Sequence, residues 1–220
     1  MLLSTPCNCI ERRILKGGVQ GSGRLFVQVG AGVGNLDSRT IDGFSEFMGR
    51  QRLVDGDLIV VVEPNPMNVA LLEQGWSGSR NIDVQPLAVI PSGSAAHVLI
   101  LWFAREDGPN FQVTSHNRQH VLDHYPNGTI ESFEVEAVPI DLLLRSVRGD
   151  RELELLAVDV ESLDAEILMS IDWQEFDFNA VSFESFHMGE MEEEVRSMLM
   201  RSGYVPAGMD SMQTVLIHCF

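Results

Sequence analysis

Short segments rich in apolar and β-branched residues alternate along this chain with segments whose apolar residues recur at helical spacing, and no other feature restricts its fold so strongly. The runs at 25–29, 58–62, 153–158 and 179–185 have the length and β-branched content of buried strands. The segments between them carry apolar residues three or four positions apart, as at 163–171. Strands that are buried on both faces and joined by helices form parallel sheets. We therefore predict an α/β fold with a mostly parallel sheet and helices on both faces.

Further apolar segments complete the predicted sheet. We expect another strand at 82–89, and an antiparallel pair formed by 97–104 and 132–138 with a polar loop between them. The last two segments, 203–206 and 212–219, are expected to close the chain as a terminal hairpin with an antiparallel edge. Helices are expected within 36–48, 66–72, 140–147, 163–171 and 190–201.

The chain is predicted to form one domain. Its 220 residues suit a single α/β domain, and they contain neither an internal repeat nor a convincing linker. Residues 1–24 are expected to lead into the first strand, with a short helix near 10–15 and a glycine-rich stretch at 17–23. The predicted domain therefore covers 25–220.

The charge of the chain restricts its partners. Its 32 acidic and 15 basic residues give a net charge of −17, which repels nucleic-acid phosphates and anionic membrane surfaces. The longest apolar runs, 58–62 and 98–104, are too short to span a bilayer. We therefore expect a small-molecule partner, with no nucleic acid and no membrane. The oligomeric state does not follow from the sequence.

The cysteines favour a reducing compartment. Cys7, Cys9 and Cys219 are an odd number, and the first two are too close in sequence for an unstrained bridge. No secretory signal is visible in the first residues. These features predict free thiols and a cytoplasmic location.

Residues suited to ligand binding follow the predicted strands. In open α/β sheets, ligands bind beyond the carboxyl ends of the strands, near the switch in strand order. Gly30, Gly32 and Gly34 follow the first strand, and Glu63 follows the second. Glycines let the backbone turn tightly and approach a ligand, and a carboxylate can accept hydrogen bonds from both hydroxyls of a ribose. Glu63 also suits a helix start, and the two roles are compatible because the sugar would lie beside that helix.

The spacing of these residues favours S-adenosylmethionine over NAD. The dinucleotide fingerprint needs Gly-x-Gly-x-x-Gly and an acid about 20 residues further on. Here the glycines follow Gly-x-Gly-x-Gly, and Glu63 lies 29 residues beyond Gly34. Asp37, in the first turn of the expected helix, would also repel a pyrophosphate, whereas the zwitterionic methionine end of S-adenosylmethionine tolerates it.

Four stretches resemble the FkbM-type family of S-adenosylmethionine-dependent methyltransferases. They are the first strand with its glycine loop at 26–34, the strand exit and helix start at 62–73, the Asp-Val-Glu segment at 155–168, and the strand at 179–184 that ends in glutamate. The resemblance covers about residues 25–217, and its second and third stretches are the most specific.

The resemblance implies a fold, a reaction and a set of site residues. The fold is the class I methyltransferase sheet, Rossmann-like, of about seven strands with an antiparallel last strand. The reaction is O-methylation of a hydroxyl on a sugar or another small metabolite. The implied cofactor-binding residues are Gln28, Gly30, Ala31, Gly32, Gly34, Glu63, Pro64, Ala88 and Asp159. Three positions depart from the family pattern: Gln28 replaces an acid, Ser162 replaces a glycine, and Leu155 or Ala157 replaces a lysine.

Asp159, Glu161 and His187 are the candidate catalytic residues. Asp159 and Glu161 stand two positions apart at a strand exit, and we expect only one of them to point straight into the site. We expect Asp159 to contact the cofactor or the acceptor, and Glu161 to serve the helix start or to support Asp159. His187, three residues after Glu184, is the expected general base.

The polar loop at 104–131 is expected to cover the acceptor site. Ser115 and His116 in this loop, together with Glu184, are the candidate substrate-binding residues. His116, His120 and His124 could share one helix face, but no glutamate follows His116 as the zinc-binding His-Glu-x-x-His pattern requires.

Other functions remain open at this point. An Asp-x-Glu pair could hold a divalent cation, but further oxygen ligands are not identifiable, so no metal is predicted. Two alternatives to an active methyltransferase are a S-adenosylmethionine-binding protein with weak or absent catalysis and, with less support, an NAD(P)-dependent oxidoreductase.

Overall fold

The computed structural model describes residues 23–34, 42–186, 188–209 and 213–219. The expected lead-in segment, with its short helix near 10–15, lies outside the described residues. So does the first half of the helix expected within 36–48.

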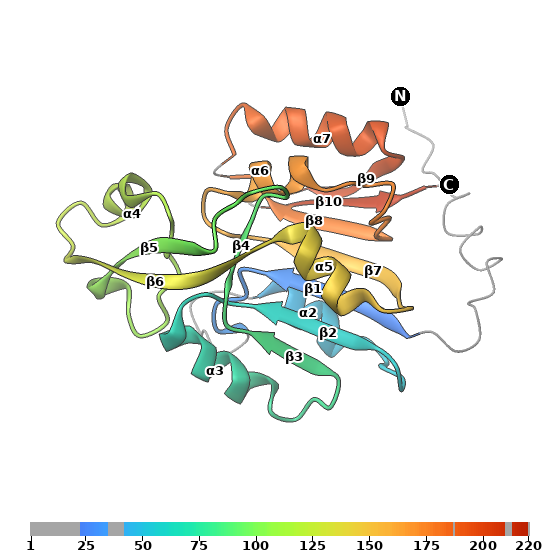
Figure 1. The fold of residues 1–220 in the computed structure, drawn as a ribbon, viewed down its shortest axis with the longest axis horizontal. Coiled ribbons are helices and arrows are strands. Elements are labelled where there is room, and N and C mark those ends of the chain that lie inside the picture. Colours follow the sequence, from blue (N-terminus) through green and yellow to red (C-terminus); the bar gives the residue numbers. More distant parts are fainter. Residues whose placement is uncertain (1–22, 35–41, 187, 210–212, 220) are drawn as a thin grey trace.

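The main sheet has seven strands within the described residues, in the order β3-β2-β1-β7-β8-β10-β9 (Figure 1). Every pairing among the first five strands of this order is parallel, whereas β10 is antiparallel to both β8 and β9. The predicted sheet of about seven strands with an antiparallel last strand is therefore confirmed. The strands are β1 (Arg24–Val29), β2 (Leu58–Val62), β3 (Ile82–Gln85), β7 (Glu152–Val158), β8 (Ala180–Glu184), β9 (Tyr204–Met209) and β10 (Gln213–His218).

Helices cover both faces of this sheet, as predicted. Because side chains alternate along a strand, Val27 of β1 packs in the larger apolar cluster and Phe26 packs in the smaller one on the opposite face. The larger cluster includes side chains of α5 (Ile140–Arg148), α6 (Asp164–Ser170) and α7 (Met191–Arg201), and the smaller includes side chains of α2 (Gly43–Gly49) and α3 (Pro66–Trp76).

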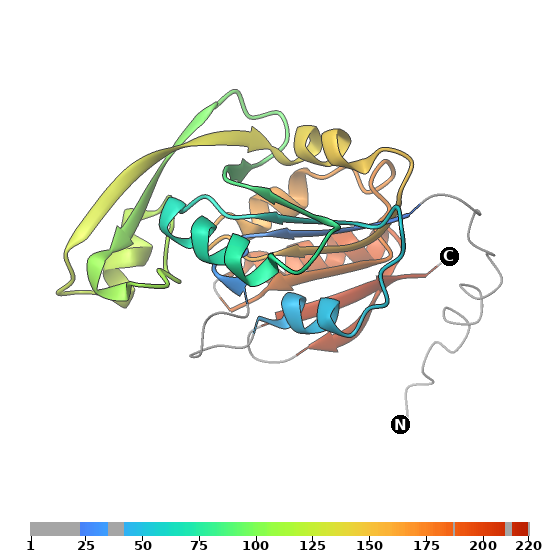
Figure 2. The same cartoon turned by 90° about the horizontal axis from the view of Figure 1, so that it is seen from below.

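A second sheet of three strands, in the order β4-β6-β5, extends from the edge at which the parallel strands end (Figures 1 and 2). It consists of β4 (Ala88–Ile90), β5 (Val98–Ala104) and β6 (Ile130–Pro139). The predicted antiparallel pairing of β5 with β6 is confirmed. We call residues 98–139, from β5 to β6, the arm. Its loop is not entirely irregular, since it contains the short 3-10 helix η2 (Arg105–Asp107) and the helix α4 (Arg118–His124).

The strand predicted at 82–89 is wrong in one respect. It forms two strands, β3 and β4, that belong to different sheets. Pro86 follows the last residue of β3 and has no backbone N–H to donate, so the ladder with β2 ends at the pairing of Val62 with Gln85. The chain then turns and pairs again with β6 through Ala88.

Cys219, just after β10, forms a disulfide. The expectation of three free thiols is therefore wrong, and the argument for a reducing compartment loses this support. None of the helices in the described part of the chain has the length and apolar character needed to cross a bilayer.

Candidate active site

A cavity of about 870 Å³ lies where the parallel strands of the main sheet end against the arm. This volume falls within the usual range for small-molecule sites. Every residue predicted to bind the cofactor lines it, as do His116, Glu161 and Glu184. Residues 110–114 of the arm line it as well. The geometry thus brings together most of the predicted site, although His187 lies outside the described residues.

The glycine turn after β1 needs its glycines for two different reasons. Gly30, Gly32 and Gly34 all have positive φ angles, of 82°, 53° and 57°. A Cβ on Gly30 would lie 1.6 Å from the carbonyl oxygen of Asp159, because the exits of β1 and β7 run side by side. A Cβ on Gly32 would meet nothing within 4 Å, so this backbone remains open to a ligand.

Glu63 connects the second strand exit to the glycine turn. Its side chain is buried, with the residue only 4% exposed. One carboxylate oxygen accepts a hydrogen bond from the Gly32 N–H at 2.8 Å, and the other accepts from the Asn65 N–H at 2.9 Å. Burial raises the pKa of Glu63 to about 7, and these hydrogen bonds oppose that rise. The two motifs that pointed to a nucleoside site are therefore in direct contact.

Gln28, where the family pattern has an acid, holds a second carboxylate in the cavity wall. Its Nε2 donates to Oδ1 of Asp42 at 3.0 Å. Asp42 precedes α2 and caps it by accepting hydrogen bonds from the N–H groups of Phe44 and Ser45. Both Gln28 and Asp42 line the cavity. The sequence analysis missed Asp42 because it placed this residue inside an expected helix at 36–48, although an aspartate before an apolar helical run is a helix-capping signal.

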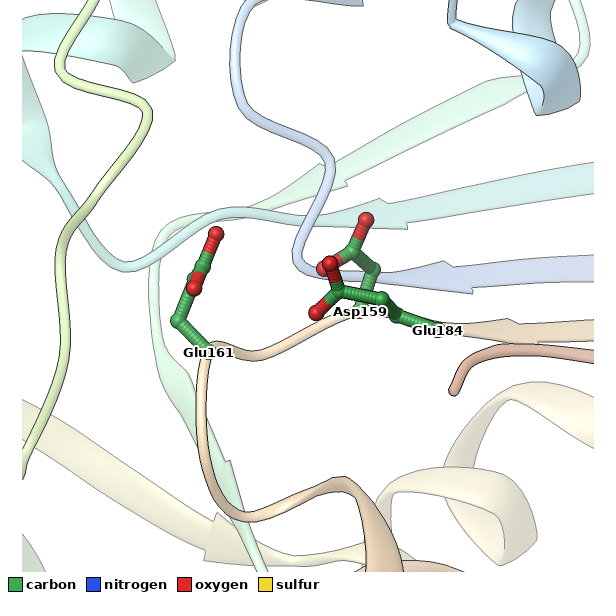
Figure 3. A group of neighbouring side chains, drawn as sticks. All are labelled: Asp159, Glu161 and Glu184. Atoms are coloured by element: carbon green, nitrogen blue, oxygen red, sulfur yellow. The ribbon is translucent and has the colours of Figure 1, made fainter. Parts of the chain in front are cut away.

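Three carboxylates gather at the exits of β7 and β8. Asp159, Glu161 and Glu184 each offer an oxygen, and these oxygens lie within 4.8 Å of one another (Figure 3). Enclosure by the protein raises the pKa of Asp159 and of Glu184, and neighbouring carboxylates raise both further. Figure 3 shows Asp159 and Glu184 close together, with Glu161 on the loop beyond them. Asp159 and Glu184 therefore hold protons more tightly than isolated carboxylates do.

Both Asp159 and Glu161 line the cavity, so the expectation that only one of them points into the site is wrong. Glu161 also pairs with the arm. Its Oε2 lies 2.7 Å from Nε2 of His120 in α4, and this hydrogen bond raises the pKa of His120. Among the described residues, no side chain caps the start of α6, one of two roles expected for Glu161, and Asp164 in the first turn of α6 instead holds the turn that precedes the helix. Asp164 accepts hydrogen bonds from the N–H groups of Val160 and Ser162, at 2.8 Å and 3.2 Å. The contact with His120 joins residues 41 positions apart, and no local pattern in the sequence indicated it.

Ser115 has a different place from the one predicted. It is fully buried and does not line the cavity, so the expected contact with a substrate is wrong. Its hydroxyl donates to the backbone carbonyl of Glu161 at 2.6 Å and lies 2.8 Å from the hydroxyl of Ser162. Ser115 therefore attaches the arm to the turn that carries Asp159 and Glu161. His116, the next residue, does line the cavity, and burial lowers its pKa.

Comparison with known families identifies the family of this chain. The family model for the methyltransferase FkbM domain matches residues 28–206, which include every strand exit described above. The chain belongs to the FkbM methyltransferase family. The chain is therefore a methyltransferase with S-adenosylmethionine as its cofactor, and the family match disfavours the NAD(P)-dependent oxidoreductase that the sequence analysis left open. A search among curated proteins finds no match.

Solved structures with a similar arrangement are distant in sequence. Fibrillarin from Aeropyrum pernix with natively bound S-adenosyl-L-methionine has a TM-score of 0.44 and 10% identity, covering 94% of this chain and 74% of its own. The N-terminal domain of human METTL16 in complex with SAH has a TM-score of 0.42 and 10% identity, covering 98% and 71%. A ribosomal protein L11 methylase from Lactobacillus delbrueckii subsp. bulgaricus has a TM-score of 0.41 and 9% identity, covering 97% and 76%.

Ser162 stands where the FkbM methyltransferases usually have glycine, and its backbone accounts for that preference. Its φ angle is 103°, in a region of backbone conformation that residues other than glycine rarely adopt. The hydroxyl of Ser162 hydrogen-bonds with that of Ser115 and lies 3.3 Å from Nδ1 of His116. These contacts tie the arm to the turn and offset part of the backbone strain.

The raised pKa values predict an unusual dependence of stability on pH. Glu63 has a pKa of about 7 and Asp164 of about 6 in the folded protein, above their values in an unfolded chain. Between the unfolded and the folded pKa of each group, the folded protein therefore binds more protons than the unfolded chain. The stability that these groups contribute is fully present below the unfolded pKa and is lost as pH rises through the folded pKa. We expect urea denaturation without ligand to show greater stability near about pH 5.5 than near about pH 8, by on the order of a few kcal/mol. Glu63→Gln should flatten this profile, and an unchanged profile would contradict the assigned pKa.

Proposed function

We propose that this FkbM methyltransferase transfers a methyl group to a hydroxyl of a small, uncharged metabolite such as a sugar. The observation that supports this most directly is the single cavity that joins the Gly32–Glu63 contact to the carboxylates of Asp159 and Glu161. The end of the cavity at Gly32 and Glu63 suits binding of a nucleoside. The end at Asp159 and Glu161 suits binding of a hydroxyl acceptor and removal of its proton.

The cavity wall fits the nucleoside part of the cofactor. Oε2 of Glu63 accepts one hydrogen bond, from the Gly32 N–H, and keeps a lone pair for a ribose hydroxyl, whereas Oε1 accepts from the Asn65 N–H and from Nδ2 of Asn68. The open space beside Gly32 lets a ligand approach the backbone closely. We assign the ribose to Glu63 and the methionine end to the exit of β1 near Gln28.

The other end of the cavity would orient the acceptor. S-adenosylmethionine supplies a methyl group on a sulfonium centre, and the protein's contribution is mainly to position the acceptor and exclude water. Asp159 would contact the acceptor or the cofactor from the end of β7. Glu161 would take the hydroxyl proton on its carboxylate, which His120 orients through the hydrogen bond at 2.7 Å.

The charges of the cavity favour an acceptor without phosphate or carboxylate groups. No lysine or arginine lines it among the described residues, whereas Asp42, Glu63, Asp159, Glu161 and Glu184 do. An anionic acceptor would be repelled there and would find no cationic side chain to bind. A neutral polyol would instead find several hydrogen-bond acceptors.

Calorimetry followed by a transfer assay tests the proposal. S-adenosylmethionine and its demethylated product should bind, and labelled cofactor should pass its methyl group to members of a panel of sugars and hydroxylated metabolites. The matching sugar phosphates should be poorer acceptors. Tight binding of NAD with no response to either sulfur compound would contradict the proposal. Binding of the sulfur compounds without transfer to any acceptor would instead favour a cofactor-binding protein without catalysis.

Glu63→Ala is expected to weaken binding of the demethylated product by about tenfold or more, because hydrogen bonds to a charged group contribute about 1.5–3 kcal/mol. Asp57→Ala is the matched control. Asp57 is also a buried carboxylate that accepts two backbone hydrogen bonds, from Arg24 and Val54, but it lies at the opposite end of β2. The control should lose stability and keep its affinity. Equal affinity of Glu63→Ala and the unchanged protein would make the ribose assignment wrong.

A further inference from the structure

We infer that Gln28 and Asp42 together form the binding site for the ammonium group of the cofactor's methionine end, with Asp42 supplying the negative charge that position 28 lacks. This inference rests on the proposed function, because it assumes that S-adenosylmethionine occupies the cavity. It adds Asp42 to the site and assigns a separate role to each end of the Gln28 amide.

The side-chain oxygen of Gln28 is a buried hydrogen-bond acceptor that no donor in the described part of the protein reaches. The residue is 6% exposed, and its Oε1 has no hydrogen-bond partner among the described residues. Leaving a buried polar atom unsatisfied costs about 1–3 kcal/mol, so such atoms in a binding cavity indicate a ligand donor. The hydrogen bond from Nε2 to Asp42 fixes the amide, since turning it over would place two oxygens against each other. Oε1 is therefore held ready for a donor from the cavity.

Asp42 places a negative charge in the cavity wall beside Gln28. It lines the cavity, and within the described residues it forms no salt bridge. Its charge is among those that raise the pKa of Asp159, which places it electrostatically near the carboxylate cluster. Capping of α2 through Phe44 and Ser45 holds its carboxylate in position.

An unpaired amide oxygen beside a carboxylate selects a cationic N–H donor. Both oxygens of Asp42 already accept hydrogen bonds from Gln28, Phe44 and Ser45, so Oε1 of Gln28 would accept from the ligand while Asp42 contributes its charge. An ammonium group gains from that charge, whereas a neutral hydroxyl does not. Gln28 lies near the end of β1, two residues before Gly30, and its hydrogen bond to Asp42 holds that carboxylate in the same cavity wall. The ammonium of the methionine end is the cationic donor that the proposed cofactor offers there.

The pair also accounts for the absence of an acid at position 28. A glutamate there would place a second carboxylate about where Nε2 of Gln28 now lies, 3.0 Å from Oδ1 of Asp42. Two carboxylates at that distance repel each other and share a proton. Gln28→Glu, although it restores the family's residue, should therefore not improve cofactor binding.

Calorimetry with the demethylated cofactor product and with its analogue lacking the amino group tests this inference. In the unchanged protein, the analogue should bind about tenfold or more weakly than the product. Asp42→Asn should remove most of this difference by weakening mainly the product, because it removes the charge while its remaining side-chain oxygen still accepts a hydrogen bond that caps α2. Glu46→Gln is the control, since Glu46 lies on the same helix and is exposed, paired with Arg50. The control should leave both affinities unchanged.

Four results would overturn the inference. Equal affinity of the product and its analogue for the unchanged protein would show that the ammonium is not recognised, and would leave the proposed function intact. Equal weakening of both ligands by Asp42→Asn would reduce Asp42 to a helix cap. A Gln28→Glu variant that binds the product more tightly would show that the charge at position 42 does not serve the ammonium. Failure of both ligands to bind the unchanged protein would overturn the proposed function as well.

Discussion

Gly30→Ala is expected to lower the free energy of unfolding by about 3 kcal/mol or more. Two costs add at this position. A residue with a Cβ would have to adopt a φ of 82°, which costs about 1–2 kcal/mol. Its Cβ would also lie 1.6 Å from the Asp159 carbonyl oxygen, so the exits of β1 and β7 would have to separate, at a cost of about 1–3 kcal/mol. Urea denaturation near neutral pH measures the sum.

Gly32→Ala is the matched control for this prediction. Gly32 also has a positive φ, of 53°, but its Cβ would meet nothing within 4 Å. It should therefore lose only about 1–2 kcal/mol, and its main effect should be weaker cofactor binding because the added methyl group enters the cavity. Similar stabilities of the two variants would show that the two strand exits do not lie as close together as described.

The sheet was predictable because its strands carry a strong local signal. Apart from 82–89, each parallel strand predicted from the sequence, such as 58–62, appears within one or two residues of its expected bounds. The prediction was wrong at 82–89, where the chain crosses from one sheet to another. Pro86 was visible in the sequence, but which strand lies beside β4 depends on the long return of β6, which no local pattern encodes.

The site was predictable only where function follows the order of the strands. Glu63 and the glycines come directly after strands, so the rule for open α/β sheets places them at one edge. Asp42 and His120 reach the cavity through contacts with Gln28 and Glu161, 14 and 41 residues away in the sequence. Such contacts depend on tertiary packing and left no periodic pattern to detect.

The same distinction explains the misplaced role of Ser115. A serine beside a histidine in a polar loop suggests contact with a substrate. The composition of the loop does not show that the loop folds back onto the turn after β7. The arm is held there because the Ser115 hydroxyl donates to the Glu161 carbonyl and hydrogen-bonds with the Ser162 hydroxyl. Side chains that attach a loop to a site and side chains that face a ligand have the same chemistry, and only packing separates them.

Glu161→Gln is expected to lower kcat by about 10²- to 10⁴-fold, the usual contribution of a general base. The substitution keeps the shape of the side chain and an oxygen that can accept a hydrogen bond from His120. It removes the carboxylate that would take the proton from the acceptor hydroxyl. The affinity for the demethylated cofactor product should change little, because Glu161 is assigned to the acceptor and not to the ribose. Transfer of labelled methyl groups to the best acceptor of the panel measures kcat, and calorimetry measures the affinity.

Glu166→Gln separates the chemistry from the general loss of a negative charge. Glu166 lies five residues further on, in the first turn of α6, and is exposed outside the cavity. It should keep nearly full activity. His120→Asn should fall between the two variants, since it leaves the Glu161 carboxylate in place but removes the imidazole that orients it. If Glu161→Gln kept the kcat of the unchanged protein while binding the cofactor product normally, another group would be the base, and His116, whose lowered pKa leaves it neutral near pH 7, would be the next residue to substitute.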